Sequence, residues 1–290
     1  MITSVLTYTL LIPFFVIGQV DFAPRIGVAS ESPMGIVDTH YNPLTALKLS
    51  FTCDEAVDVD FVLNEMSGSS PTLVNLKMAC IHMVAPGESM CKLPPREFWP
   101  EWVSVLKGLM QITGARAAEI WNEADLDASA HPHLHGCIGD GIAYGEFVAY
   151  VYDAVDGQFD IVIGAVSDIR DIFVVDMLSA ANGKFDALSF HCYEYFYLVS
   201  THDCGEQYSY ATSLIDEPVI ISETAIKYLR GPLGDFEISQ SVLFVEMVSL
   251  GCPFYWYTIC GNNWMRTDYC NRPVEYLFMS AYGFPNPANQ

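Results

Sequence analysis

Positively charged side chains are scarce in this sequence. Lysine and arginine together supply 13 of the 290 residues, against 35 aspartates and glutamates, so the formal net charge is −22. A nucleic-acid partner needs a basic surface for its phosphates, and this composition argues against one. A polyanionic substrate is disfavoured for the same reason. The charge balance fits best with a neutral substrate.

Motifs for bound nucleotides and structural zinc are also missing. The chain contains no GxGxxG turn and no Walker sequence, which are typical of nucleotide-binding open sheets. None of its nine cysteines forms a CxxC pair, so a structural zinc site is not expected. No cofactor is implied by any motif in the chain.

The cysteines instead suggest disulfides, although their pairing cannot be read from the sequence. Those in predicted loops or at strand ends are expected to form disulfides, which suit an exported protein: Cys91, Cys137, Cys204, Cys260 and Cys270. Cys192 and Cys252 fall on or beside predicted strands and are expected to be buried thiols.

The N-terminus is apolar and uncharged over residues 2–17, which resembles the core of a signal peptide. No lysine or arginine precedes it, Pro13 would interrupt a helix, and the stretch is short for a membrane span. Residues 1–19 are therefore expected to be a signal peptide, or else a retained apolar lead-in, and residues 20–290 one domain. We expect secretion and no membrane insertion of the mature domain.

Short apolar runs alternate with longer segments of helical period along the chain. This pattern is typical of βα units and a parallel sheet. The expected strands are residues 25–29, 46–51, 73–81, 117–121, 159–166, 187–193, 219–222 and 254–259. The expected helices are residues 57–66, a segment from 95, and 144–155, 168–181, 205–214, 236–250 and 274–279. Eight such units predict an α/β protein, a single (β/α)8 TIM barrel.

Two glutamates follow predicted strands of this barrel. Glu123 comes after the fourth strand and Glu223 after the seventh, so both are expected at the C-terminal mouth, where barrels of this kind keep their chemistry. Glycoside hydrolysis needs such a pair, because one carboxyl group must hold a proton for the leaving oxygen while the other is ionised.

The sequences around these strand ends resemble the clan A retaining glycoside hydrolases, specifically the β-xylosidase and α-iduronidase-like family or the cellulase-like family. The resemblance rests on Trp121-Asn122-Glu123, Ser222-Glu223-Thr224, His191-Cys192-Tyr193 and Trp256. It implies that Glu123 is the acid/base and Glu223 the nucleophile.

The resemblance also assigns substrate-binding positions. Asn122 would bind the sugar 2-hydroxyl, His191 and Tyr193 would lie beside the nucleophile, and Trp256 would be an aromatic platform for the sugar. The implied activity is cleavage of O-glycosidic bonds in a neutral oligosaccharide or polysaccharide.

Two departures from the clan pattern leave alternatives open. Alanine follows Glu123 where many members have proline, and the second strand, read from Lys48 to Cys53, lacks their arginine. The missing arginine motivates a carbohydrate-binding barrel without catalysis as the alternative. A third hypothesis is a metal site at His131, His133 and His135, but Pro132 and the lack of an HExxH motif disfavour it.

Overall fold

A computed structural model describes residues 26–30, 46–66, 71–86, 88–126, 138–195, 204–227, 243, 247, 251 and 254–257. Its eight strands are all parallel to their neighbours and form one closed barrel in chain order. The strands are β1 (Ile26–Ser30), β2 (Ala46–Phe51), β3 (Leu73–Leu76), β4 (Ala117–Ile120), β5 (Asp160–Val166), β6 (Ala187–Tyr195), β7 (Val219–Lys227) and β8 (Phe254–Tyr257). The predicted (β/α)8 barrel is confirmed.

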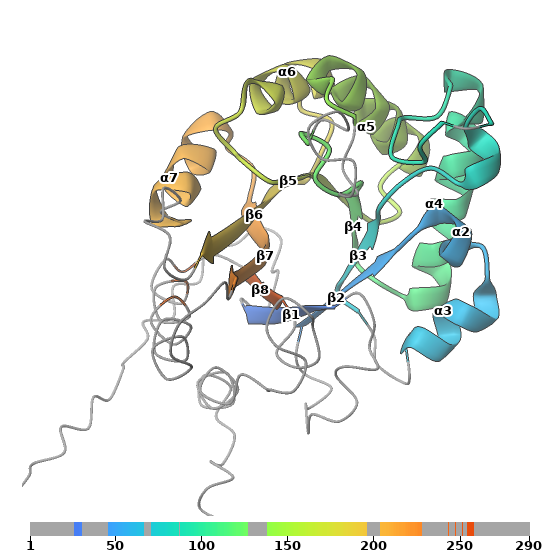
Figure 1. The fold of residues 1–290 in the computed structure, drawn as a ribbon, viewed down its shortest axis with the longest axis horizontal. Coiled ribbons are helices and arrows are strands. Elements are labelled where there is room, and N and C mark those ends of the chain that lie inside the picture. The colour runs from blue at the N-terminus through green and yellow to red at the C-terminus, as the bar shows by residue number, and fades with distance from the viewer. Residues whose placement is uncertain are drawn as a thin grey trace, which may run out of the picture.

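Helices cover the outside of the strand ring, as Figure 1 shows in a view that looks into the barrel. They are α2 (Cys53–Ala56), α3 (Val59–Met66), α4 (Trp99–Thr113), α5 (Gly141–Val155), α6 (Ile172–Ala181) and α7 (Cys204–Leu214), with short 3-10 turns η1 (Ile81–Met83) and η2 (Arg96–Phe98). Within the described residues, no helix is long and apolar enough to cross a membrane.

Local sequence signals account for where the helices begin and end. Asp140 and Asp171 accept hydrogen bonds from the first-turn amides of α5 and α6, which satisfies donors that a helix start leaves unpaired. Gly114 ends α4 in a left-handed conformation, the usual role of glycine after a helix. The predicted helix 168–181 therefore begins later, at Ile172, because Asp171 caps it.

The predicted third strand is too long at its C-terminal end. It stops at Leu76 rather than at residue 81, because Cys80 is bonded to Cys53 at the start of α2 and the chain turns into η1. Of the predicted helix 236–250, the structure describes Leu243 and Met247, which are helical and buried. Residues 1–25 and the predicted helix 274–279 lie outside the described residues.

Side-chain alternation along the strands separates two apolar regions. A large cluster fills the space between strands and helices. A smaller one fills the barrel interior and comprises Leu73, Ala117, Val162, Ala187, Ile220 and Tyr255, with Tyr193 packed against it. The second cluster is an apolar floor, and polar groups that point inward from later strand positions lie on its C-terminal side.

Candidate active site

A layer of buried polar side chains lies above the apolar floor of the barrel. Asn75 and Glu119 follow the floor residues Leu73 and Ala117 by two positions on their strands, so they point inward in the same way. On β6, Ser189 and His191 continue the inward series that begins at the floor residue Ala187. The strands thus gather charged and hydrogen-bonding groups at the end where a barrel keeps its active site.

Glu223 reaches this layer through an irregularity in β7. Ile221 pairs with Phe190 on β6, but the next pair is Glu223 with His191, so Ser222 is an extra residue. Ile221 belongs to the cluster between strands and helices, and strict alternation would turn Glu223 the same way. The bulge reverses the inward and outward alternation of side chains along β7. Glu223 therefore points into the barrel, where it is 8% exposed.

Three side chains hold the Glu223 carboxylate. Tyr193 donates a hydrogen bond to Oε2 at 2.5 Å, Lys48 donates one to Oε1 at 3.0 Å, and His191 Nε2 lies 3.7 Å from Oε1. Burial opposes ionisation, but the positive charges of His191 and Lys48 and the two hydrogen bonds outweigh it. They lower the pKa of Glu223 to about 2, so the carboxylate is ionised at neutral pH.

Glu123 lies at the end of β4 in a strained stretch of backbone. Trp121 and Glu123 have positive φ angles of 70° and 45°, and so does Ala165, at 49°. Such conformations are costly for residues other than glycine and often occur at functional sites. The Glu123 amide donates to the Ala165 carbonyl at 2.7 Å, which ties the β4 loop to the irregular end of β5.

Asp125 fastens the same two loops together. Its carboxylate accepts hydrogen bonds from the amides of Ser167 and Asp168 and from the Ser167 hydroxyl, at 2.7 to 3.1 Å. Burial raises the pKa of Asp125, although these hydrogen bonds favour its ionised form. This role was not predicted, because in the sequence Asp125 is only one residue of a polar loop.

His191 lies between the two glutamates. Its Nδ1 is 3.1 Å from Glu123 Oε1, and its Nε2 faces Glu223. Burial disfavours the imidazolium, but Glu223 and the hydrogen bond to Glu123 outweigh burial and the charge of Lys48, so the pKa of His191 is raised. The structure thus brings together four sequence-predicted residues, Glu123, Glu223, His191 and Tyr193.

Lys48 is a charged residue of the polar layer that sequence reasoning missed. It lies within β2 and is fully buried, and it contacts Glu119 at 2.6 Å as well as Glu223. The clan A pattern has an arginine at the end of this strand, and this chain lacks it. The signal that could have revealed Lys48 is the alternation Lys48-Leu49-Ser50-Phe51, in which Leu49 and Phe51 pack outward and Lys48 must face the barrel interior.

The remaining predicted positions are only partly described. Asn122 is half-buried between the positive-φ residues Trp121 and Glu123. The main chain of Trp256 pairs with Val28 on β1 and Thr224 on β7, next to Glu223, but its side chain lies outside the described part of the structure. His131, His133 and His135 also lie outside it.

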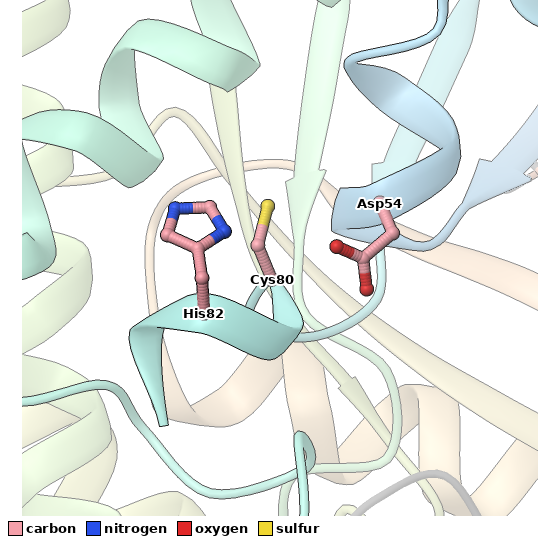
Figure 2. A group of neighbouring side chains, drawn as sticks. All are labelled: Asp54, Cys80 and His82. Carbon is pink, nitrogen blue, oxygen red and sulfur yellow. The ribbon is translucent and has the colours of Figure 1, made fainter. Parts of the chain in front are cut away.

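One group of possible metal ligands occurs among the described residues, away from the polar layer. Figure 2 shows Asp54 and His82 on either side of Cys80, with candidate ligand atoms within 4.8 Å of one another. The Cys80 sulfur is bonded to Cys53, so it offers no thiolate, and zinc requires the deprotonated thiol. Asp54 already accepts the Ile81 amide, and His82 pairs with Glu101. The group fits a structural disulfide better than a metal centre.

The cysteine predictions are partly confirmed. Cys204 forms a disulfide, but its partner is Cys192, so the prediction of a buried thiol at Cys192 was wrong. Cys192 is buried as expected, yet strand alternation turns it outward between His191 and Tyr193, where it meets the first residue of α7.

Comparison with solved structures identifies glycoside hydrolases with the same fold. A family 30 subfamily 8 xylanase from Clostridium acetobutylicum has a TM-score of 0.59 at 13% identity, with 86% of this chain and 68% of that chain covered. A family 39 glycoside hydrolase from Bacteroides cellulosilyticus has a TM-score of 0.57 at 14% identity, with 85% and 59% covered.

A family 10 endo-β-1,4-xylanase from Gloeophyllum trabeum has a TM-score of 0.55 at 13% identity, with 85% of this chain and 88% of that chain covered. No protein-family model matches the sequence, and no curated protein matches it either. This chain spans 59% of the family 39 protein and 68% of the family 30 protein. At these identities the similarity establishes the fold, and the chain shares the (β/α)8 barrel of these glycoside hydrolases.

Proposed function

We propose that this protein is a retaining glycoside hydrolase that acts on a neutral oligosaccharide or polysaccharide. The observation that carries the proposal is the pairing of Glu223 and Glu123 across His191 at the C-terminal end of the barrel. Glu223 is ionised and fixed by Lys48 and Tyr193, as a nucleophile must be, while Glu123 can carry the proton that the leaving oxygen needs.

The mechanism has two steps. In the first, a Glu223 oxygen attacks the anomeric carbon, the glycosidic C–O bond breaks, and the leaving oxygen takes the proton of Glu123. In the second, water attacks the same carbon and gives its proton to Glu123, and Glu223 departs as a carboxylate. Asn122 would bind the 2-hydroxyl and Trp256 would stack on the sugar, as the resemblance to clan A enzymes implies.

Lys48 weakens the case for a binding-only barrel, which rests on the arginine missing from the second strand. Lys48 supplies the positive charge at Glu223 that the missing arginine would otherwise give. A neutral substrate also suits a chain of net charge −22, because a polyanion would be repelled.

Hydrolysis of aryl glycosides tests the proposal. The panel comprises xyloside, glucoside, mannoside, galactoside and arabinoside, followed by digestion of xylan and other neutral polysaccharides, since two of the enzymes with this fold are xylanases. Wild type should turn over one substrate class, and Glu223→Ala should reduce kcat by at least about 1,000-fold with the fold intact. Glu146→Ala, an exposed site on α5, is the matched control and should keep full activity.

The dependence of the rate on the leaving group distinguishes the role of Glu123 from that of Glu223. With a dinitrophenyl glycoside the first step needs little protonation, so Glu123→Ala should still release a burst of phenolate and then stall, whereas Glu223→Ala should not. Retention is checked by NMR of the first-formed anomer. Sugar binding without turnover in wild type would instead support a carbohydrate-binding barrel, and activity in Glu223→Ala would refute the assigned nucleophile.

The proposed place of action is outside the cytoplasm. The Cys53–Cys80 and Cys192–Cys204 disulfides are typical of oxidising compartments, and the apolar segment of residues 1–19 would act as the export signal. Detection of the protein in the culture medium, with its N-terminus sequenced, tests both points. A cytosolic protein with free thiols at these four cysteines would contradict them.

A further inference from the structure

Lys48 is buried between two carboxylates of different roles. Its ammonium nitrogen lies 2.6 Å from Glu119 Oε2 and 3.0 Å from Glu223 Oε1. Lys48 and Glu119 are both 0% exposed and come from strands β2 and β4, beneath the mouth of the barrel. Under the proposed mechanism Glu223 reacts with the sugar. Glu119 is fully buried and cannot reach the sugar, so its carboxylate needs another explanation.

The charge on Glu223 changes during the proposed reaction. Before attack, Lys48 faces two negative groups. Once the C–O bond to the sugar forms, Glu223 becomes a neutral ester and no longer balances a cation. A buried charge that loses its partner is strongly destabilising. Glu119 supplies the partner that stays, because it forms no bond to the sugar.

We infer that Glu119 and Lys48 form a permanent ion pair that positions and charges Glu223 for attack and then neutralises Lys48 while Glu223 is bonded to the sugar. The inference rests on the proposed function and deepens it: both are positioning residues that act through Glu223. Asn75 supports the arrangement, since its amide donates to the carbonyl oxygens of Glu119 on β4 and of Trp121 just after that strand.

The pair predicts a specific division of effects between the two chemical steps. In Glu119→Gln the glycosyl-enzyme leaves Lys48 unpaired, so the intermediate should form more slowly and break down faster. A side chain with a purely structural role would not divide the steps in this way. In Lys48→Met the attacking Glu223 loses its cation instead, so kcat/KM should fall by at least about 100-fold. Lys48→Arg restores a cation and should recover most of that loss.

Other groups around Glu223 bear on the pH profile. Tyr193 and His191 face it from β6 and Lys48 from β2, while Glu119 acts through Lys48 and Glu123 through His191. Since Lys48 favours the ionised form of Glu223, the acidic limb of kcat/KM should move to higher pH in Lys48→Met and return in Lys48→Arg. Glu119→Gln should move the same limb to lower pH.

The deciding experiment measures two rate constants with a 2-deoxy-2-fluoro glycoside of the sugar that wild type cleaves. These are the rate of covalent inactivation and the rate of reactivation after excess reagent is removed. In Glu119→Gln the ratio of inactivation to reactivation should fall at least tenfold relative to wild type. Thermal unfolding confirms folding of each variant. The double variant Lys48→Met/Glu119→Gln replaces any single variant that does not fold. It leaves no unpaired cation beside the glycosyl-enzyme, so it should reactivate no faster than wild type.

Failure of this inference is distinguishable from failure of the proposed function. If wild type hydrolyses no glycoside, both are refuted. If wild type hydrolyses one and Glu223→Ala does not, but the rate ratio in Glu119→Gln equals that of wild type, the inference alone is overturned and Glu119 is only structural. A fall in the ratio together with rescue by Lys48→Arg supports the inference.

Discussion

At the scale of single residues, the ionised state of Glu223 depends on the charges of His191 and Lys48 and on two hydrogen bonds in a buried site. Hydrogen bonds to a charged group are stronger than neutral ones, and each one made to the carboxylate favours its ionised form. Tyr193 is the simplest to remove, because phenylalanine keeps its ring and its packing on the apolar floor.

Tyr193→Phe should weaken catalysis without unfolding the protein. Loss of the donated hydrogen bond raises the pKa of Glu223, so the acidic limb of kcat/KM moves to higher pH. A charge-assisted hydrogen bond contributes about 1.5–3 kcal/mol, so kcat/KM should fall about 10- to 100-fold. The pH dependence of kcat/KM on the best aryl glycoside measures both effects. Tyr152→Phe on α5 is the control, and an unshifted limb in Tyr193→Phe would contradict the assigned contact.

The residue types at the strand ends could be predicted from the sequence. How far a side chain reaches, and whether it points into or out of the barrel, could not. Glu123, His191 and Tyr193 lie where the strand pattern predicts them. Lys48 was missed because its head group acts several atoms away from its strand position. The bulge at Ser222 was invisible because nothing in Ile221-Ser222-Glu223 differs from ordinary alternation, although it decides which way Glu223 points.

At the scale of elements, two adjacent helices pack unusually closely. α5 and α6 meet at Gly141 and Gly145, where an added Cβ would lie 2.4 Å from the carbonyl oxygens of Phe173 and Met177 respectively. Those atoms are backbone and cannot move aside without shifting α6. Helix periodicity predicts both helices but not this contact, because a glycine within a helix reads only as a weak helix former.

A pair of glycine substitutions should therefore have effects of opposite sign. Gly145→Ala forces α5 and α6 apart and should lower the free energy of unfolding by about 1–3 kcal/mol. Gly108→Ala, within α4, meets no atom within 4 Å and should raise it by about 0.5–1 kcal/mol, because alanine favours the helix. Urea unfolding followed by circular dichroism measures both. Equal effects would mean that the helix contact is looser than described.

The Cys192–Cys204 disulfide links the site strand β6 to helix α7. Its loop is short, with a sequence separation of 12, so removing it as Cys192→Ala/Cys204→Ala should lower the free energy of unfolding by about 3 kcal/mol. Activity should also fall, because Cys192 lies between His191 and Tyr193. Cys53→Ala/Cys80→Ala should lose similar stability with less effect on kcat. An unchanged kcat in the first double variant would show that the strand holds its own position.

At the scale of the whole molecule, negative charge dominates, yet the site sets the charge of its own groups locally. The chain carries a net charge of −22, while Glu223 is ionised because of Lys48, His191 and Tyr193 beside it. Composition predicts a neutral substrate, and this stays a prediction. It could not predict the site, where His191, Lys48 and the hydrogen bond from Tyr193 keep Glu223 ionised in spite of its burial.

The stability of the whole protein in acid depends on how strongly the site keeps Glu223 ionised. The pKa of Glu223 is about 2 in the folded protein, against an ordinary value of 4.5. A carboxyl group with a depressed folded pKa stabilises the fold above its unfolded pKa and loses that contribution as pH falls towards the folded value. His191 and Lys48 have raised pKa values, so they stay charged on the acid side and do not titrate in this window.

Wild type should therefore lose more stability on acidification than Glu223→Gln, which has no proton to gain at this position. As the pH falls from about 5 to about 3, the free energy of unfolding of wild type should fall by about 2 kcal/mol more than that of Glu223→Gln. Urea titrations of both proteins at the two pH values measure it. Groups common to both, such as Asp125 with its raised pKa, cancel in the comparison. A constant difference would mean that Glu223 titrates alike in the folded and unfolded chains, and that Lys48 does not hold it ionised.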